Sequence, residues 1–494
     1  MKKTNRLITL FEIIFLILFI GILCICMTGT QRNIPWYNML IVSCAALLGI
    51  SAVFRLLVKV EKFIIPHKKL ILSVFCVIWG FALYLFSCTA RNEPAHDYQI
   101  VYGAAENYAA GVDVDWAYFA RWKNNQFLFL LLSVLMKISR MLWHGDPFYF
   151  ILLFNVTAVI VTGICIYRLI WWQCGMIRYC WIGLLLFTGF IPCWGGTFNF
   201  YTDSVSIGFS IWGIYLAILA IRKKRGIFFY GIVAGLLWAI GFLIKATVGI
   251  SLIAFLLIAL WRWKHPGIKG CLFGILMGFI FIYGNFQVVS SRLPCSELEE
   301  DYAMPIEYWL ALGSSGNGGY GENSEFATIC INTPGTSAKR EISREYIVER
   351  YTNLWDIKRL VSKVRYNFAS GNIGLADYNR YPLTPFYEYF NDYGKYGGYI
   401  TMVTSGYLYA ILFLSIMGTI IKKKWKRQEE SDILSLITQL TLCGLVVFLM
   451  VWESNNRQLY NHLPWLAVAG ALGLQGIFGD TDVVQNDIFK QTIH

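Results

Sequence analysis

Two carboxylates beside apolar runs are the residues best suited to chemistry. Asp97 lies between His96 and Tyr98, just after a long apolar run ends, and Asp203 closes a Tyr-Thr-Asp triplet that begins at Tyr201. A positioned carboxylate can accept a proton from a reacting hydroxyl group or stabilise developing charge. The structural alternative is that each acid caps the N-terminus of a helix. Both alternatives stay open for Asp97, whereas an acid at membrane depth, such as Asp203, is costly unless it faces a cavity.

Four basic residues could bind an anionic substrate. Lys245 lies inside the apolar segment 241–249, where a lone lysine is costly unless it reaches the headgroups or a partner. Arg121 and Lys123 follow an aromatic cluster, and anchoring at the membrane interface is the alternative for them. Arg457 lies between the last two apolar runs. Because cationic side chains bind phosphate strongly, all four are candidate phosphate ligands.

Aromatic side chains, which make up 17% of the chain, offer surfaces for a ring-shaped substrate. Most of them must lie in the core or at the membrane interface. The residues predicted to contact a sugar or an acceptor are His96, Tyr98, Tyr201 and Tyr320. Further loop residues that could stack on a sugar are Trp116, Tyr118, Trp194 and Trp309. The sequence does not select among them.

The composition indicates an all-α polytopic membrane protein. Of the 494 residues, 57% are hydrophobic and 15% are charged, and the mean hydropathy is +0.53. Soluble domains have about 45–50% apolar and about 25% charged residues. A membrane β-barrel would instead show short segments of alternating hydrophobicity. The net charge of +12 comes mainly from basic clusters between apolar runs, as in cytoplasmic loops, so nucleic acid is not predicted as a partner.

Apolar runs predict where the chain crosses the bilayer. They are 7–28, 36–54, 70–90, 127–143, 147–167, 179–192, 203–221, 227–244, 247–261, 270–290, 400–421, 432–452 and 463–479. Basic residues place the start of the chain and the loop 55–69 inside, and Asp97 and Asp203 therefore outside. Counting crossings between these anchors leaves 127–143 as an interfacial or re-entrant helix. About twelve spans remain, with both termini inside.

The crossings divide the chain into three parts. Residues 1–290 form a membrane module whose outer loops, 91–146 and 193–202, carry the candidate catalytic residues. Residues 291–399 form a large extracytoplasmic loop, and 400–494 form C-terminal helices with a short cytoplasmic tail. Cys295 and Cys330 both fall in the large loop and could pair on an oxidising side of the membrane. There is no CxxC metal pattern, Walker motif or dinucleotide fingerprint.

The order of four motifs resembles the GT-C superfamily, the integral-membrane glycosyltransferases that use polyprenyl-phosphate sugars as donors. The motifs are the segment around Asp97, the aromatic-basic element from Tyr118 to Lys123, the triplet 201–203 and the segment from Gly241 to Lys245. The resemblance covers residues 70–300 and is nearest to bacterial members related to protein O-mannosyl and aminoarabinose transferases. Segments that begin at Trp309 and Gly318 also resemble firmicute cell-envelope members.

The resemblance implies a role for each matching residue. Asp97 would be the catalytic base, and Asp203 a second acid of the active site. Lys123, Lys245 and Arg457 would hold the donor phosphate, with Arg121 as a further cationic contact. The chain departs from the family by having two extra spans before Asp97. It also has Gln99 where metal-dependent relatives have a second carboxylate, so neither a metal nor another cofactor is predicted.

The predicted activity is an inverting transfer of a sugar from a polyprenyl phosphate to an acceptor of the cell envelope, outside the bacterial cytoplasmic membrane. The acceptor could be a glycan, a lipid or a protein. One alternative is a flippase or transporter for a lipid-linked glycan, although such proteins typically show internal repeats and polar residues at the midplane. Another is a glycan polymerase or ligase, which Arg457 and His462 leave open.

Overall fold

The fold is built from helices. The computed structural model describes residues 2–29, 34–142, 145–223, 226–265, 267–350, 356–375, 385, 387–390, 394–422 and 433–479. Every regular element in these residues is a helix. Nine of the helical segments in this part of the chain are long and apolar enough to cross a membrane. The prediction of an all-α polytopic membrane protein is therefore confirmed.

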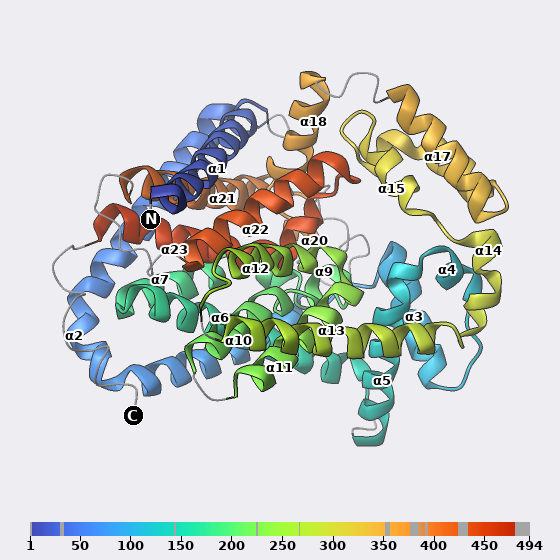
Figure 1. Cartoon of the computed structure of the whole chain (residues 1–494), viewed down its shortest axis with the longest axis horizontal. Coiled ribbons are helices and arrows are strands. Elements are labelled where there is room, and N and C mark those ends of the chain that lie inside the picture. The colour runs from blue at the N-terminus through green and yellow to red at the C-terminus, as the bar shows by residue number, and fades with distance from the viewer. Residues whose placement is uncertain are drawn as a thin grey trace.

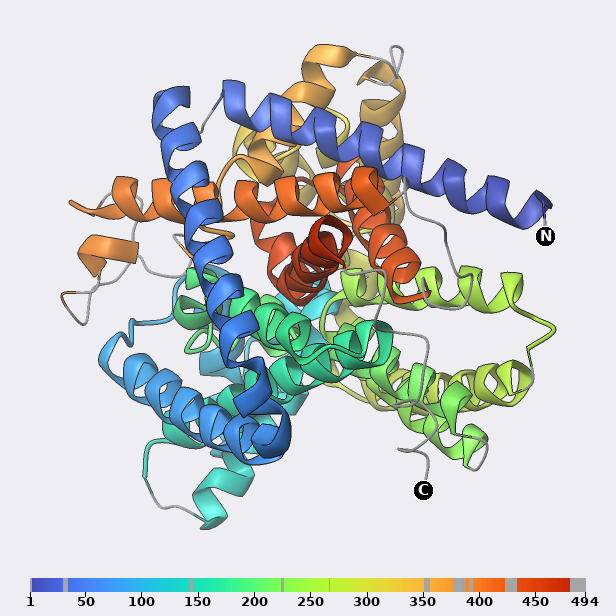
Figure 2. The same ribbon diagram turned by 90° about the vertical axis from the view of Figure 1, so that its left-hand side faces the viewer.

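The first two helices differ from the predicted boundaries. Helix α1 spans Lys2–Thr28, and α2 is one helix of 54 residues, Trp36–Thr89. The prediction of a loop at 55–69 between two separate helices is wrong. Pro66 is the one proline inside α2, and the helix changes direction part way along its length (Figures 1 and 2). Because proline lacks an N–H and crowds the preceding turn, it bends a helix without necessarily ending it.

A charge pair ties the middle of α2 to the body. Helix α6 is Pro147–Cys174 and α7 is Ile177–Thr188. The Arg178 guanidinium at the start of α7 donates to Glu61 over 2.7 Å. The stretch 55–69 is thus held against the start of α7.

The segment predicted to be interfacial, 127–143, forms α5 (Gln126–Leu142). With the short η1 helix before it (Lys123–Asn125), it meets the same length and hydropathy criteria as the other candidate spans. It packs against α3 (His96–Ala109) and α6. The number of crossings stays a prediction.

The remaining long helices pack closely through small residues. They are α10 (Phe209–Arg222), α11 (Ile227–Ile244), α12 (Gly249–Trp261), α13 (Ile268–Ser290), α21 (Gly397–Lys422), α22 (Ile433–Val451) and α23 (Leu463–Phe478). Gly235 lies against the Ile275 backbone of α13, and Gly473 of α23 lies against the Leu414 backbone of α21. Small residues let helices in a membrane approach to backbone contact.

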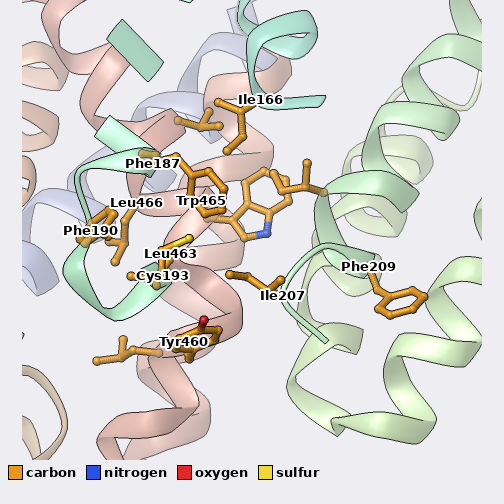
Figure 3. Close-up of a cluster of buried hydrophobic side chains, with 14 of the residues drawn as sticks. Ile166, Phe187, Phe190, Cys193, Ile207, Phe209, Tyr460, Leu463, Trp465 and Leu466 are labelled. Carbon is orange, nitrogen blue, oxygen red and sulfur yellow. The ribbon is translucent and has the colours of Figure 1, made fainter. Parts of the chain in front are cut away.

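Helix α23 lies in the centre of the body, with α21 and α22 beside it (Figure 2). Its Trp465 is fully buried and donates its indole N–H to the Ser210 hydroxyl of α10 over 3.0 Å. Apolar side chains around it come from the α7–α8 region as well as from α23 (Figure 3), where α8 is Ile191–Gly195. This packing fixes the segments on both sides of the candidate site, because α9 (Thr202–Val205) and η7 (Asn456–His462) adjoin it.

A second, smaller core lies in the 291–399 segment. Its helices are η3 (Pro294–Leu298), α14 (Glu299–Tyr302), α15 (Ile306–Gly313), η4 (Tyr320–Asn323), α16 (Ser324–Asn332), α17 (Thr336–Arg350), α18 (Ile357–Phe368) and α20 (Tyr387–Phe390). Helices α15, α17 and α18 lie along one edge of the molecule (Figure 1). The second core consists of Tyr308, Ala311, Leu312, Phe326, Ala327 and Cys330.

The suggested pairing of Cys295 with Cys330 is wrong, since both are free and buried in the structure. Cys295 packs in the main core, whereas Cys330 belongs to the second core. The Gln126 amide contacts the Cys295 sulfur at 3.5 Å, and the Cys330 sulfur lies 4.0 Å from the Ser343 hydroxyl. Each thiol is therefore packed as a small apolar side chain.

Candidate active site

Asp203 forms the charged centre of the site. Its Oδ1 lies 2.7 Å from Lys245 Nζ, and its Oδ2 lies 3.8 Å from Arg457 Nε. The Asp203 side chain is 3% exposed, whereas those of Lys245 and Arg457 are 17% and 22% exposed. Two cations and one carboxylate leave a net charge of +1. The positive groups are the ones that reach the surface.

Local backbone structure positions each of these three side chains. Asp203 lies in the first turn of α9, and the Ser204 hydroxyl holds that turn by donating to the Asn199 carbonyl. Lys245 follows the end of α11 in extended backbone, so the helix stops at the point where the charge is needed. The Asn455 side chain accepts the Arg457 N–H over 3.2 Å and thereby starts η7.

Arg457 is confined on two further sides. Its guanidinium lies 5.6 Å from the centre of the Tyr201 ring, within the range of a cation–π contact. On another side, the Arg457 Cβ packs against Gly374, whose backbone is left-handed (φ 77°). A side chain at position 374 would overlap that Cβ. Tyr201 thus lies beside the guanidinium, and Gly374 packs against the base of the Arg457 side chain.

Asp97 is linked to this centre through side-chain hydrogen bonds. The Tyr118 hydroxyl donates to Asp97 Oδ1 over 3.1 Å, and the Asn125 amide donates to the Tyr118 oxygen over 2.8 Å. The Tyr201 hydroxyl in turn donates to Asn125 Oδ1 over 3.3 Å. Burial is the main cause that raises the pKa of Tyr118 and Tyr201, and Asp97 adds to it. Both phenols therefore stay protonated and act as donors.

The capping alternative for the two acids is wrong. The N-cap residue of α3 is Ala95, without a side-chain cap, and Asp97 uses Oδ1 to accept from Tyr118. The N-cap residue of α9 is Tyr201, while Asp203 forms ion pairs. Each carboxylate is thus directed to a side-chain partner elsewhere in the fold.

His96 and Tyr98, the chain neighbours of Asp97, lie in different environments. His96 is exposed and has a left-handed backbone (φ 52°), which is uncommon for a residue with a side chain. Tyr98 is buried, and its hydroxyl donates to the Phe198 carbonyl over 3.4 Å. This bond attaches α3 to the segment that leads to Tyr201 and Asp203.

Three other predicted residues lie away from the Asp203 ion pairs. The Lys123 ammonium donates to Glu299 over 2.6 Å, at the start of α14. The Arg121 guanidinium lies 5.6 Å from the centre of the Tyr302 ring, at the end of α14. Tyr320 is exposed at the start of η4. The two cations thus hold the 294–302 region against the first loop.

Glu453 is a further site residue, to which the sequence assigned no role. It is partly buried, and burial raises its pKa to about 7. Nearby Arg457 and Lys245 oppose that shift, and Asp97 reinforces it. Glu453 therefore adds a third carboxyl group to the site, and it lies within electrostatic reach of Arg457, Lys245 and Asp97. The sequence feature that could have identified Glu453 is its position four residues before Arg457.

A buried lysine fixes the loop beside Glu453. Lys363 of α18 donates to the Gly313 carbonyl over 2.7 Å and to the Trp452 carbonyl over 2.9 Å. Burial lowers its pKa to about 7. The Ser454 N–H donates to the Gly318 carbonyl over 2.8 Å. The glycine-rich segment 313–321 is thereby fixed on residues 452–454. The sequence placed both segments outside the membrane but not together.

In the part of the chain that the structure describes, no group of three or more His, Cys, Asp and Glu side chains is arranged to hold a metal ion. Beside Asp203, Lys245 and Arg457 supply positive charge.

Comparisons with known proteins give similarity at the level of structure. No protein-family model matches the chain, and no curated protein sequence matches it. The chain is similar to the archaeal oligosaccharyltransferase AglB from Archaeoglobus fulgidus in complex with an inhibitory peptide and a dolichol-phosphate, with 12% identity and a TM-score of 0.43. That alignment covers 82% of this chain and 50% of the other, so the chain spans about half the length of AglB.

A second similarity is to ArnT from Cupriavidus metallidurans bound to undecaprenyl phosphate. The identity is 10% and the TM-score 0.33, over 81% of this chain and 77% of ArnT. Its apo state aligns with 10% identity and a TM-score of 0.31, over 82% and 76% of the two chains. With TM-scores this low, the similarities assign no activity to the chain.

Proposed function

We propose that the chain is a membrane-embedded glycosyltransferase that takes its sugar from a polyprenyl phosphate and inverts the anomeric centre. One observation carries the proposal. Two partly exposed cations, Lys245 and Arg457, are held by the buried Asp203, and the Arg457 guanidinium lies 5.6 Å from the centre of the Tyr201 ring, from which hydrogen bonds through Asn125 and Tyr118 lead to Asp97. An anion site and a proton acceptor are thereby combined in one cluster.

The cationic end suits the leaving group. A sugar joined to a polyprenyl phosphate is a phosphodiester with one negative charge, and release of polyprenyl phosphate adds a second. The net charge of +1 at Lys245, Arg457 and Asp203 meets that developing charge. Preorganised groups stabilise a transition state because they need no reorganisation as charge appears. The guanidinium can bind two phosphate oxygens, and the ammonium acts as a point charge.

The carboxylate end suits the acceptor. The acceptor oxygen attacks the anomeric carbon while the bond from that carbon to the phosphate oxygen breaks and its electron pair stays on the phosphate. The proton of the acceptor hydroxyl passes to Asp97. Tyr118 donates to Oδ1, so we assign Oδ2 to the proton. General-base catalysis of this kind contributes roughly 10²–10⁴-fold, and one direct displacement inverts the configuration.

The same proposal covers cofactors and location. Lys245 and Arg457 supply positive charge at the phosphate, so no metal or nucleotide is invoked. The site faces the outside of a bacterial cytoplasmic membrane, and the acceptor belongs to the cell envelope. Basic clusters in the loops away from the site support this orientation, since such clusters mark cytoplasmic loops.

The test measures cleavage of a defined donor. Purified full-length chain in lipid nanodiscs is incubated with an oligosaccharide as acceptor and with undecaprenyl phosphate carrying glucose, mannose, galactose or N-acetylglucosamine. We expect mass spectrometry to detect release of undecaprenyl phosphate from at least one of these donors. The sugar of the product should have the opposite anomeric configuration to that of the donor. If every donor stays intact while the chain moves one of them across a liposome membrane, the proposal is wrong and the chain is a transporter.

A further inference from the structure

Three tryptophans from distant segments lie side by side near the carboxyl groups of the site. Trp122 lies between α4 (Trp116–Arg121) and η1, Trp309 lies in α15, and Trp452 follows α22. The ring centres of Trp122 and Trp309 are 5.5 Å apart, and those of Trp309 and Trp452 are 6.4 Å apart with planes 15° from parallel. All three rings are partly exposed. They form an aromatic strip.

Close backbone packing sets the position of this strip. Gly313, at the end of α15, lies against the backbone of Val451 and Trp452, so that a methyl group at 313 would overlap it. This close approach brings Trp309 next to Trp452. Lys363 then holds both segments, since it donates to the carbonyls of Gly313 and Trp452. The strip is therefore built into the fold.

Two hydroxyl groups beside the strip are buried without a hydrogen-bond partner among the described residues. They are Tyr308 Oη and Ser454 Oγ. The Tyr308 ring centre is 6.0 Å from that of Trp122, and Ser454 follows Glu453 directly. Burial, followed by Glu453 and more weakly by Asp97, raises the pKa of Tyr308, so this hydroxyl lies within electrostatic reach of both carboxyl groups. A buried hydroxyl without a partner is unfavourable, and such groups are satisfied by ordered water or by a ligand.

An apolar strip next to unsatisfied hydroxyls has the character of a carbohydrate site. One face of a sugar ring presents C–H groups that pack on an indole, and its edge presents hydroxyls that need donors and acceptors. Anchoring at the membrane interface explains partly exposed tryptophans. It does not explain buried hydroxyls without partners beside them.

We propose that Trp122, Trp309 and Trp452, together with the Tyr308 and Ser454 hydroxyls, form the acceptor subsite, and that the acceptor is a glycan. The glycan-binding part stands on the aromatic strip and the two hydroxyls alone. That the bound glycan is the acceptor rests on the proposed function.

The test measures binding independently of transfer. Saturation-transfer NMR is recorded with full-length chain in nanodiscs and with chitotriose, maltotriose or a serine-containing tetrapeptide as probe. We expect saturation to pass from the protein to the sugar-ring protons of at least one trisaccharide. Trp309→Ala and Trp452→Ala should lower the affinity by about tenfold, as loss of an aromatic contact and part of its buried area implies. Trp309→Tyr should retain most of the binding.

The matched control is Trp36→Ala, because Trp36 is a tryptophan at the start of α2 that is 61% exposed. It should leave trisaccharide binding unchanged, and thermal unfolding of every variant shows whether it is folded. The proposal is overturned if neither trisaccharide binds, if the alanine variants bind as well as the original chain, or if the tetrapeptide binds and depends on the same tryptophans.

The two proposals fail separately. Cleavage of the undecaprenyl-phosphate sugar without trisaccharide binding overturns the glycan subsite and leaves the proposed function standing. Trisaccharide binding that depends on Trp309 and Trp452, without cleavage of any donor, supports a glycan site and overturns the transferase.

Discussion

The two aspartates of the site are the same residue type in opposite environments. Asp203 is buried and forms ion pairs with two cations, whereas Asp97 is partly buried and accepts from a phenol. An ion-paired carboxylate is a poor proton acceptor, because its charge is already stabilised by its partners. In the proposed function, Asp203 accordingly positions Lys245 and Arg457, and the role of proton acceptor is assigned to Asp97.

The largest expected effect comes from removing the proton acceptor. Asp97→Asn keeps the shape of the side chain and its bond to Tyr118 but not its basicity, so the rate of donor cleavage with acceptor should fall roughly 10²–10⁴-fold. Thermal unfolding in detergent should change little, since the variant removes no ion pair. Full activity in Asp97→Asn would show that Asp97 is not the base.

Replacing Asp203 should lower the stability of the fold more than replacing Asp97 does. Asp203→Ala leaves two cations in a partly buried place without their carboxylate, and breaking a buried ion pair costs about 3 kcal/mol or more. Asp97→Ala is the matched control, with an expected loss of about 1 kcal/mol for one hydrogen bond. The free energy of unfolding in mixed micelles measures both. Equal losses would remove the contrast between the two residues.

The cations provide the next test. Arg457→Ala should weaken binding of undecaprenyl phosphate roughly 10–100-fold, since a hydrogen bond to a charged group contributes about 1.5–3 kcal/mol. Lys123→Ala is the matched control because Lys123 is paired with Glu299. Isothermal titration with undecaprenyl phosphate in nanodiscs compares them. A loss in Lys123→Ala as large as in Arg457→Ala would restore the phosphate-binding role that the sequence suggested for Lys123.

The last test concerns pH. The pKa of Glu453 is raised from about 4.5 to about 7, so the folded state binds its proton more tightly than the unfolded state does. The stability from this group is complete below pH 4.5 and is lost as the pH rises to about 7. Glu453→Gln should remove that loss, and melting temperatures between pH 4.5 and 8 measure it.

His462 requires that comparison to be made between variants. Burial lowers the pKa of His462 to about 4, so its contribution falls as the pH drops from 6.5 to 4, opposite in sign to that of Glu453. The difference between the original chain and Glu453→Gln isolates the carboxyl group. An unchanged pH profile in Glu453→Gln would mean that folding does not raise the pKa of Glu453.

Several features of the fold could be predicted from local sequence. Continuous apolar runs specify helices in a membrane, because the backbone must satisfy its hydrogen bonds internally. The predictions failed where a local signal was ambiguous. The basic residues of 55–69 suggested a loop, but this stretch has one helix-breaking residue, Pro66, and a helix continues through it. The shared loop of Cys295 and Cys330 said nothing about the two cores in which they are packed.

In the candidate site, too, some features could be predicted from local sequence and others depended on tertiary packing. Composition and the position of charges along the chain were enough to select Asp97, Asp203, Lys245 and Arg457, because a charged group at membrane depth stands out against apolar neighbours. Which of them meet depended on packing between elements far apart in sequence: Arg457 reaches Asp203 only because α23 and η7 are packed against the segments around α9. Periodicity and hydropathy are local properties of the chain, whereas an ion pair, a partner for Lys123 or a raised pKa at Glu453 depends on which surfaces the folded helices bring together.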